Sequence, residues 1–151
     1  MGITLWRSQN TPRVVIQSGV VPGECWCFKG AEGRIAFHLS SRIIPTAFTY
    51  EHIPRSLSRD GHIQSAPSKF IVYGLKSEDD KEPQTLGEYR YLIDSGEPLQ
   101  RFMVQDQQTA LHTFRYIELS IKSNHGHPEY TCLYRFRVHG TPVFNEDQIK
   151  T

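Results

Sequence analysis

The sequence lacks the features that mark several large classes of protein. It contains no run of 18 apolar residues, so no segment is long enough to cross a membrane as a helix. It has no stretch of five like charges and a formal net charge of only +1, which gives no electrostatic reason to expect nucleic acid as a partner. The opening MGITLWRSQN has neither the charged nor the apolar region of a signal peptide. If the protein works in a secretory compartment, we therefore expect this chain to be part of a longer one.

Motifs of catalysis are also missing. There is no Gly-x-Ser-x-Gly, no phosphate-binding glycine loop and no cluster of carboxylates. His52, in YEHIPRSLS, has no nucleophile and orienting acid near it in the sequence. His125 and His127 are two residues apart, a spacing that suits neither a helical nor a finger-type zinc site. These absences argue against an enzyme and against a zinc site at the histidines.

Cysteine is scarce and odd in number, with only Cys25, Cys27 and Cys132. Cys25 and Cys27 alternate in ECWCF, so on a strand their side chains would point to opposite faces. This suits one cysteine bonded to a distant partner better than a local pair. Three reduced, buried thiols in a cytosolic protein remain an equal alternative.

Short β-rich segments are what the chain has in quantity. Helical periodicity is nearly absent, and nine prolines and eleven glycines separate the segments from one another. The pattern predicts a single all-β domain, an antiparallel β-sandwich or jelly roll. The segments are RVVIQ, CWCFKG, RIAFHLS, TAFTYEHI, KFIVYGL, EYRYLI, QRFMVQ, FRYIELSIKS and YTCLYRFRVHG.

Two places have the chemistry of a binding site. In VVIQSGVVPGECW, Gly19 and the pair Pro22-Gly23 indicate a tight excursion whose inward-turned carbonyls a cation could satisfy, although an ordinary Pro-Gly turn is favoured on these residues alone. The hydroxyl, imidazole and aromatic groups of His52, Ser65, Tyr130 and Tyr134 are suited to capture a peptide end. The strand face that carries the two tyrosines could equally be core.

Longer stretches resemble a known family. PGECWCFKGAEG, YEHIPRSLS, IQSAPSKFIVYG and above all HGHPEYTCLYRFRVHG are similar to the SUN domain of inner nuclear membrane proteins. We expect the SUN domain to occupy residues 1–143 and residues 144–151 to form a flexible tail. The resemblance implies a compact, galactose-binding-like β-sandwich, borne on a trimeric coiled-coil stalk in the perinuclear space. Its implied partner is the C-terminal KASH peptide of an outer nuclear membrane protein. The two would form the LINC bridge, which transmits force between cytoskeleton and nucleus in nuclear positioning, migration and anchorage.

The resemblance also implies roles for individual residues. It implies a disulfide between Cys25 and Cys132, with Cys27 free and buried. It implies that backbone oxygens around residues 14–25 hold a potassium-like ion, and that two further residues lie near the contact between protomers. The implied KASH pocket is His52, Ser65, Tyr130 and Tyr134; the ion loop is Val14, Gln17, Gly19, Glu24 and Tyr134; the protomer contact is Gly33 and Arg135.

The start of the chain departs from the family pattern. GITLW resembles only the closing half of the lid, the hairpin that clamps the KASH peptide, and no stalk precedes it. We therefore expect this chain by itself to bind KASH weakly and to be monomeric, whereas the full-length protein is expected to be a homotrimer. The alternative function is a carbohydrate-binding β-sandwich module.

Overall fold

Extended segments dominate the structure, a computed structural model that describes residues 11–143. This range contains no α-helix and three short 3-10 helices, η1 (Pro12–Ile16), η2 (Arg55–Leu57) and η3 (Gln107–Leu111). The prediction of an all-β fold is confirmed. The strands are β1 (Trp26–Lys29), β2 (Gly33–Glu51), β3 (Lys69–Leu75), β4 (Gln84–Arg90), β5 (Leu99–Met103), β6 (Phe114–Ile121), β7 (Tyr130–Leu133) and β8 (Arg135–Pro142).

The largest differences between the predicted segments and the observed strands are at three places. RVVIQ, expected as a strand, lies mostly in η1, where Pro12 stands at the start of the helix and Val15 is fully buried. RIAFHLS and TAFTYEHI join into the single 19-residue strand β2. YTCLYRFRVHG is divided into β7 and β8 at Tyr134. The expected lid segment GITLW and the expected tail 144–151 lie outside the described residues.

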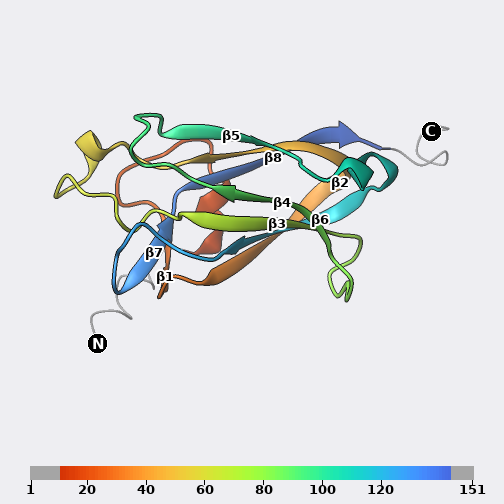
Figure 1. The fold of residues 1–151 in the computed structure, drawn as a ribbon, viewed down its shortest axis with the longest axis horizontal. Coiled ribbons are helices and arrows are strands. Elements are labelled where there is room, and N and C mark those ends of the chain that lie inside the picture. The colour runs from red at the N-terminus through yellow and green to blue at the C-terminus, as the bar shows by residue number, and fades with distance from the viewer. Residues whose placement is uncertain (1–10, 144–151) are drawn as a thin grey trace.

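Strand β2 connects the two layers of the sandwich. Its first part pairs with β6, which continues through β3 to β4, whereas its second part pairs with β8 on one side and β5 on the other. All these pairings are antiparallel, and Figure 1 shows β5 and β8 on one side of the molecule and β3, β4 and β6 on the other. β2 can belong to both layers because its register is irregular between His38 and Ile43 and again between Pro45 and Ala47. Such irregularities bend a strand and tolerate a proline that has no N–H to donate.

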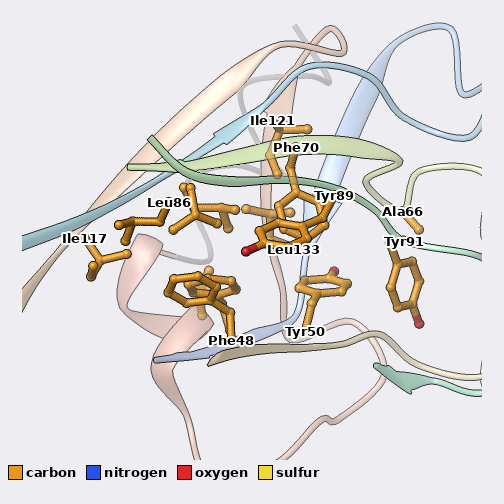
Figure 2. Close-up of a cluster of buried hydrophobic side chains, with 14 of the residues drawn as sticks. Phe48, Tyr50, Ala66, Phe70, Leu86, Tyr89, Tyr91, Ile117, Ile121 and Leu133 are labelled. Atoms are coloured by element: carbon orange, nitrogen blue, oxygen red, sulfur yellow. The ribbon is translucent and has the colours of Figure 1, made fainter. Parts of the chain in front are cut away.

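The main core lies between the layers and is rich in aromatic rings (Figure 2). Phe48 is fully buried, with its ring centroid 5.8 Å from that of Phe136 and 6.2 Å from that of Tyr89. One face of β6 also belongs to this core. Its members Ile117, Leu119 and Ile121 are all buried in this core.

A second, smaller cluster lies at the end of the sandwich where β1 and β7 form a two-stranded sheet. It is separate from the main core and contains two cysteines and a tyrosine that the sequence singled out. Its buried members are Cys25, Ile53, Ile63, Cys132 and Tyr134, and Val20, Cys27, Ile93 and Tyr130 pack against them. Across residues 11–143 we find no helix with the length and apolarity needed to span a membrane.

Candidate functional site

The pairing of β1 with β7 determines which cysteines are bonded. The antiparallel register places Cys27 directly opposite Cys132, with their Cα atoms 4.0 Å apart, and these two residues form the disulfide. Cys25 precedes β1 and is free and buried. The expected bond between Cys25 and Cys132, with Cys27 free, is therefore wrong in this structure. The reason is register, because the residue that faces Cys132 across the ladder is Cys27.

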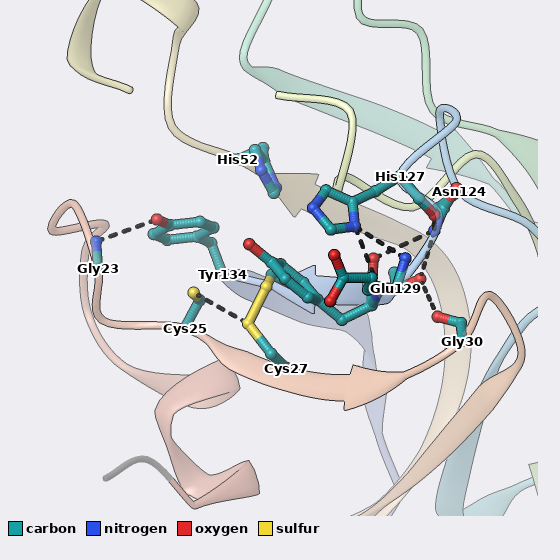
Figure 3. Close-up of a disulfide and its surroundings, with 12 residues drawn as sticks. Gly23, Cys25, Cys27, Gly30, His52, Asn124, His127, Glu129 and Tyr134 are labelled. Carbon is teal, nitrogen blue, oxygen red and sulfur yellow. Dashed lines mark hydrogen bonds between the residues drawn. A yellow bond between two sulfur atoms is a disulfide. The ribbon is translucent and has the colours of Figure 1, made fainter. Parts of the chain in front are cut away.

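The free thiol nevertheless lies beside the disulfide. The Sγ atom of Cys25 is 3.6 Å from that of Cys27, and the three sulfur atoms all lie within 4.8 Å of one another (Figure 3). Burial raises the pKa of the Cys25 thiol, while a hydrogen bond with the Tyr134 side chain opposes that rise. A thiol, a disulfide and a phenol therefore share one small buried space.

A buried polar network underlies this end of the sandwich. The Tyr50 hydroxyl accepts a hydrogen bond from the backbone N–H of Tyr134 (3.1 Å) and lies 2.7 Å from Nδ1 of His52. Because the backbone N–H already supplies one proton to that oxygen, the hydroxyl can donate its own proton to Nδ1, which places the imidazole proton on Nε2. The rings of His52 and Tyr134 meet edge to face at 4.7 Å.

His52 is held in its neutral form. Its side chain is only 1% exposed, and burial, with a smaller contribution from the charge of His125, lowers its pKa to about 3. The neutral imidazole therefore offers a hydrogen-bond donor without a positive charge. This is different from the charged histidine that commonly pairs with carboxylates on protein surfaces.

The turn before β1 is tied to Tyr134. The N–H of Gly23, which has a φ of +86°, donates to the Tyr134 hydroxyl at 3.1 Å (Figure 3). Burial raises the pKa of Tyr134, which keeps the phenol protonated and able to donate as well as accept. The position of this turn therefore depends on a side chain more than 100 residues away.

The expected ion ligands other than Tyr134 lie in the segment of residues 14–24, which precedes β1. Gln17 bridges the segment, since its Nε2 donates to the carbonyl of Glu24 (3.1 Å) and its backbone N–H donates to the carbonyl of Val14 (3.2 Å). Each of these carbonyls has a second lone pair. Hard backbone oxygens of this kind fit an alkali or alkaline-earth cation better than a soft metal.

Ser65 and Tyr130 form the more accessible part of the site. The Ser65 carbonyl accepts from the N–H of Cys132 at 2.8 Å, which brings the loop after His52 alongside β7. Both Ser65 and Tyr130 are half-buried, whereas Tyr134 is 5% exposed. The structure thus brings all four expected pocket residues to one end of the sandwich, but it buries His52 and Tyr134 beneath the surface.

Three positioning residues were not found from the sequence. Nδ1 of His127 accepts from the backbone N–H of Tyr130 (3.2 Å), and the two rings lie 3.9 Å apart. Asn124 Nδ2 donates to the carbonyls of His127 and Tyr130 and to Thr131 Oγ1. The third is Tyr50, described above. The signal available for Asn124 and His127 was the density of polar groups in NHGHPEY, whose histidine spacing was weighed only against a zinc site.

A shallow cavity adjoins the buried histidine. Its volume is about 160 Å³, and Ile53, Ile63 and Tyr91 are among the residues that line it. The Tyr91 ring lies 6.3 Å from that of His52. Arg55 and Asp94, also in the lining, form an exposed ion pair at 3.1 Å. The cavity offers apolar walls directly beside the polar groups of the site.

Comparison with known proteins identifies the family. The profile of the family described as Sad1 / UNC-like C-terminal matches residues 5–142. The chain is 54% identical to human SUN domain-containing protein 1 over 94% of this chain, and 52% identical to the Klaroid protein of Drosophila melanogaster over 93% of it. The chain belongs to the SUN-domain family. It spans only 18% and 14% of the length of those two relatives.

Solved structures place the SUN domain among β-sandwich modules. A chitobiase fragment from Bacteroides thetaiotaomicron matches with a TM-score of 0.70 and 16% identity, covering 97% of this chain and 84% of that one. A family 32 carbohydrate-binding module of Streptococcus pneumoniae EndoD matches with a TM-score of 0.66 and 12% identity, covering 87% and 86%. At these identities the likeness shows the fold alone, and it confirms the predicted sandwich.

The two residues expected at a protomer contact have partners inside the SUN domain. A Cβ atom on Gly33 would lie 2.5 Å from the Phe28 ring, so the glycine is needed for close packing. Arg135 Nη1 lies 3.1 Å from Glu51 Oε1, and the arginine side chain is 13% exposed. Their role between protomers stays a prediction.

The low pKa of His52 predicts a pH dependence of stability. The group titrates near 6.5 when unfolded and near 3 when folded, so between these values only the unfolded chain binds the proton. The contribution of His52 to the free energy of unfolding is complete above pH 6.5. It is lost as pH falls toward 3, at up to about 1.4 kcal/mol per pH unit. The free energies of unfolding of wild type and His52→Gln, measured with urea, should therefore approach each other as the pH falls through this window. His62→Gln, which changes an exposed histidine, should retain the wild-type dependence of the free energy of unfolding on pH. The same dependence in all three proteins would contradict the low pKa of His52.

The disulfide predicts a large effect of reduction. A bond between residues 105 apart should stabilise the fold by about 4 to 5 kcal/mol in the chain-entropy model. Dithiothreitol and Cys132→Ala should each lower the free energy of unfolding by a similar amount, measured by urea titration. Alkylation followed by intact-mass measurement should find one thiol before reduction and three after it. Three thiols in the oxidised protein would show that the bond does not form.

Proposed function

We propose that this SUN domain binds the C-terminal end of a KASH peptide and has no catalytic role. The observation that carries the proposal is the convergence of His52, Ser65, Tyr130 and Tyr134, from separate segments, at the disulfide-linked end of the sandwich. In the full protein this binding would form the LINC bridge across the perinuclear space and couple cytoskeleton to nucleus. Family membership supports this reading.

The chemistry of the site suits a terminal carboxylate. The half-buried Ser65 and Tyr130 carry hydroxyls that can donate to it, and a hydrogen bond to a charged group contributes about 1.5 to 3 kcal/mol. His52 and Tyr134 form the floor of the site and hold its shape. The adjoining cavity beside Ile53 and Ile63 would accept apolar side chains that precede the carboxylate.

Rigidity is the second element of the proposal. The disulfide fixes β7 against β1, and His127 and Asn124 fix the backbone at Tyr130. A flexible peptide loses conformational entropy when it docks, and a receptor that is already ordered adds little to that cost. The cross-link and the hydrogen bonds would thus act on affinity as well as on stability.

We also propose a potassium-like ion in the 14–25 turn and a trimer in the full protein. The ion would bind backbone oxygens of Val14, Gln17, Gly19 and Glu24 and of Tyr134, and hold the turn that Tyr134 supports. Gly33 and Arg135 would lie near the contact between protomers. The chain covers under a fifth of the length of its first relatives, so the trimer and its contacts are proposed for the full protein.

Isothermal titration tests the peptide proposal. A KASH tail peptide with a free carboxylate should bind a form extended through lid and stalk, and C-terminal amidation should weaken binding at least about tenfold. Tyr130→Phe and Ser65→Ala should each weaken it by about 1 to 2 kcal/mol. Tyr73→Phe on β3 is the matched control and should bind as wild type. Equal affinity for acid and amide peptides would contradict carboxylate recognition, and binding on a glycan panel instead would favour the carbohydrate alternative.

Cation exchange tests the ion site. Replacing potassium with choline, which is too large for a cage of backbone carbonyls, should lower the Tm of the chain at constant ionic strength. Gln17→Ala should reduce the difference in Tm between the two salts, because it removes the side chain that bridges the turn. A Tm that is the same in both salts would rule out a stabilising ion in this turn.

A further inference from the structure

The three sulfur atoms of the chain converge beside the two-stranded sheet of β1 and β7. Cys25 precedes β1, so the alternation of side chains along a strand does not apply to it, and its Sγ lies only 3.6 Å from that of Cys27. Cys132 faces Cys27 from β7, and all three sulfurs lie within 4.8 Å of one another (Figure 3). A disulfide uses only two of these sulfur atoms, so it does not account for the position of the third.

The spacing of the sulfur atoms fits the ligand set of a soft metal ion. Zinc held tetrahedrally by thiolates has Zn–S distances of about 2.3 Å, which places neighbouring sulfurs about 3.8 Å apart. The 3.6 Å between the sulfurs of Cys25 and Cys27 is close to that separation. Thiolates select soft ions such as zinc and copper(I), in contrast to the backbone oxygens of the turn that precedes β1.

We propose that the reduced domain binds one zinc ion through the thiolates of Cys25, Cys27 and Cys132. A dithiol reductant first passes two electrons and two protons to the disulfide of Cys27 and Cys132, and becomes a disulfide itself. The three thiols then lose three protons as three Zn–S bonds form. Three thiolates and one Zn²⁺ leave one net negative charge, and a water molecule takes the fourth position of the tetrahedron.

The surroundings of the three sulfurs suit a bound ion. Cys25 and Cys132 are buried, whereas Cys27 is half-buried and gives access to the site. Ile53 and Ile63 belong to the same cluster, and an apolar shell of this kind strengthens the attraction between an ion and its thiolates. Because the unfolded chain does not hold the three thiols at this spacing, zinc should stabilise the reduced fold.

Tyr134 is the positioning residue of the proposed site. Its side chain is hydrogen-bonded to Cys25, and this interaction lowers the pKa of the thiol in opposition to the effect of burial. The N–H of Gly23 donates to the Tyr134 oxygen at 3.1 Å, which leaves the hydroxyl proton to point at the sulfur. A hydrogen bond from outside the ligand set orients a metal ligand and disperses its negative charge.

Cobalt spectroscopy of the reduced chain tests the proposal. Co²⁺ is added under nitrogen to protein reduced with a phosphine, and Zn²⁺ is then added to displace it. We expect one Co²⁺ per chain with a thiolate-to-cobalt charge-transfer absorption, and complete loss of that absorption after one equivalent of Zn²⁺. Zinc should also raise the Tm of the reduced chain, and the oxidised chain should show no charge-transfer absorption.

Single variants identify the ligands. The three cysteine-to-alanine variants, once reduced, should each bind zinc at least about tenfold more weakly, since loss of even an outer-shell partner weakens a metal site by that amount. Cys25→Ala keeps the disulfide in its oxidised form, so its fold can be checked before reduction. His62→Gln, which changes an exposed histidine, is the control and should bind as wild type. Tyr134→Phe should still bind one Co²⁺, with the charge-transfer band moved to lower energy because the Cys25 thiolate has lost a hydrogen-bond donor.

Three results would overturn the proposal. The first is the absence of charge-transfer absorption in the reduced wild type, and the second is wild-type zinc affinity in reduced Cys25→Ala. The third is an equal affinity in concentrated urea, because binding would then not need the fold. If the reduced chain is unfolded without metal, zinc should restore the far-ultraviolet circular dichroism of the oxidised protein. Zinc binding without that recovery would also refute the site.

Discussion

The antiparallel pairing of β1 with β7 is the constraint on which this end of the molecule depends. Its register brings Cys27 to Cys132, places Cys25 beside them, and holds Tyr130 at the start of β7 against the same cluster. A shift of one residue would turn each of these side chains to the other face of the strand. The disulfide then keeps two segments that are distant in the chain in this register.

Buried hydrogen bonds extend that constraint into the candidate site. Tyr50 joins the backbone of Tyr134 to the ring of His52, and Tyr134 in turn holds the turn at Gly23. Each member satisfies the polar group of the next, so loss of one would leave another unpaired in a space of low dielectric. The same connections would link the proposed ion, the turn at Gly23, the buried residues of the proposed pocket and the disulfide. A structural change at one of them would then alter the others.

The resemblance of HPEYTCLYRFRVHG to its family carried more information than any periodicity did. The patterns indicated strands and a sandwich, and the structure has both. They failed at RVVIQ, because a short apolar run with a preceding proline can equally form a 3-10 helix. The positioning roles of Tyr50, Asn124 and His127 could not be predicted, since each depends on a partner brought near by folding.

The sequence by itself determined the fold class, the family and the set of residues around which a site could form, because strand-forming segments, turns and motifs are local properties. Only the tertiary structure decided which cysteine faces Cys132 and that His52 and Tyr134 are buried while Ser65 and Tyr130 stay half-exposed. Cys25 and Cys27 are chemically identical in the chain. What distinguishes them is strand register, and register results from pairing between segments far apart in sequence.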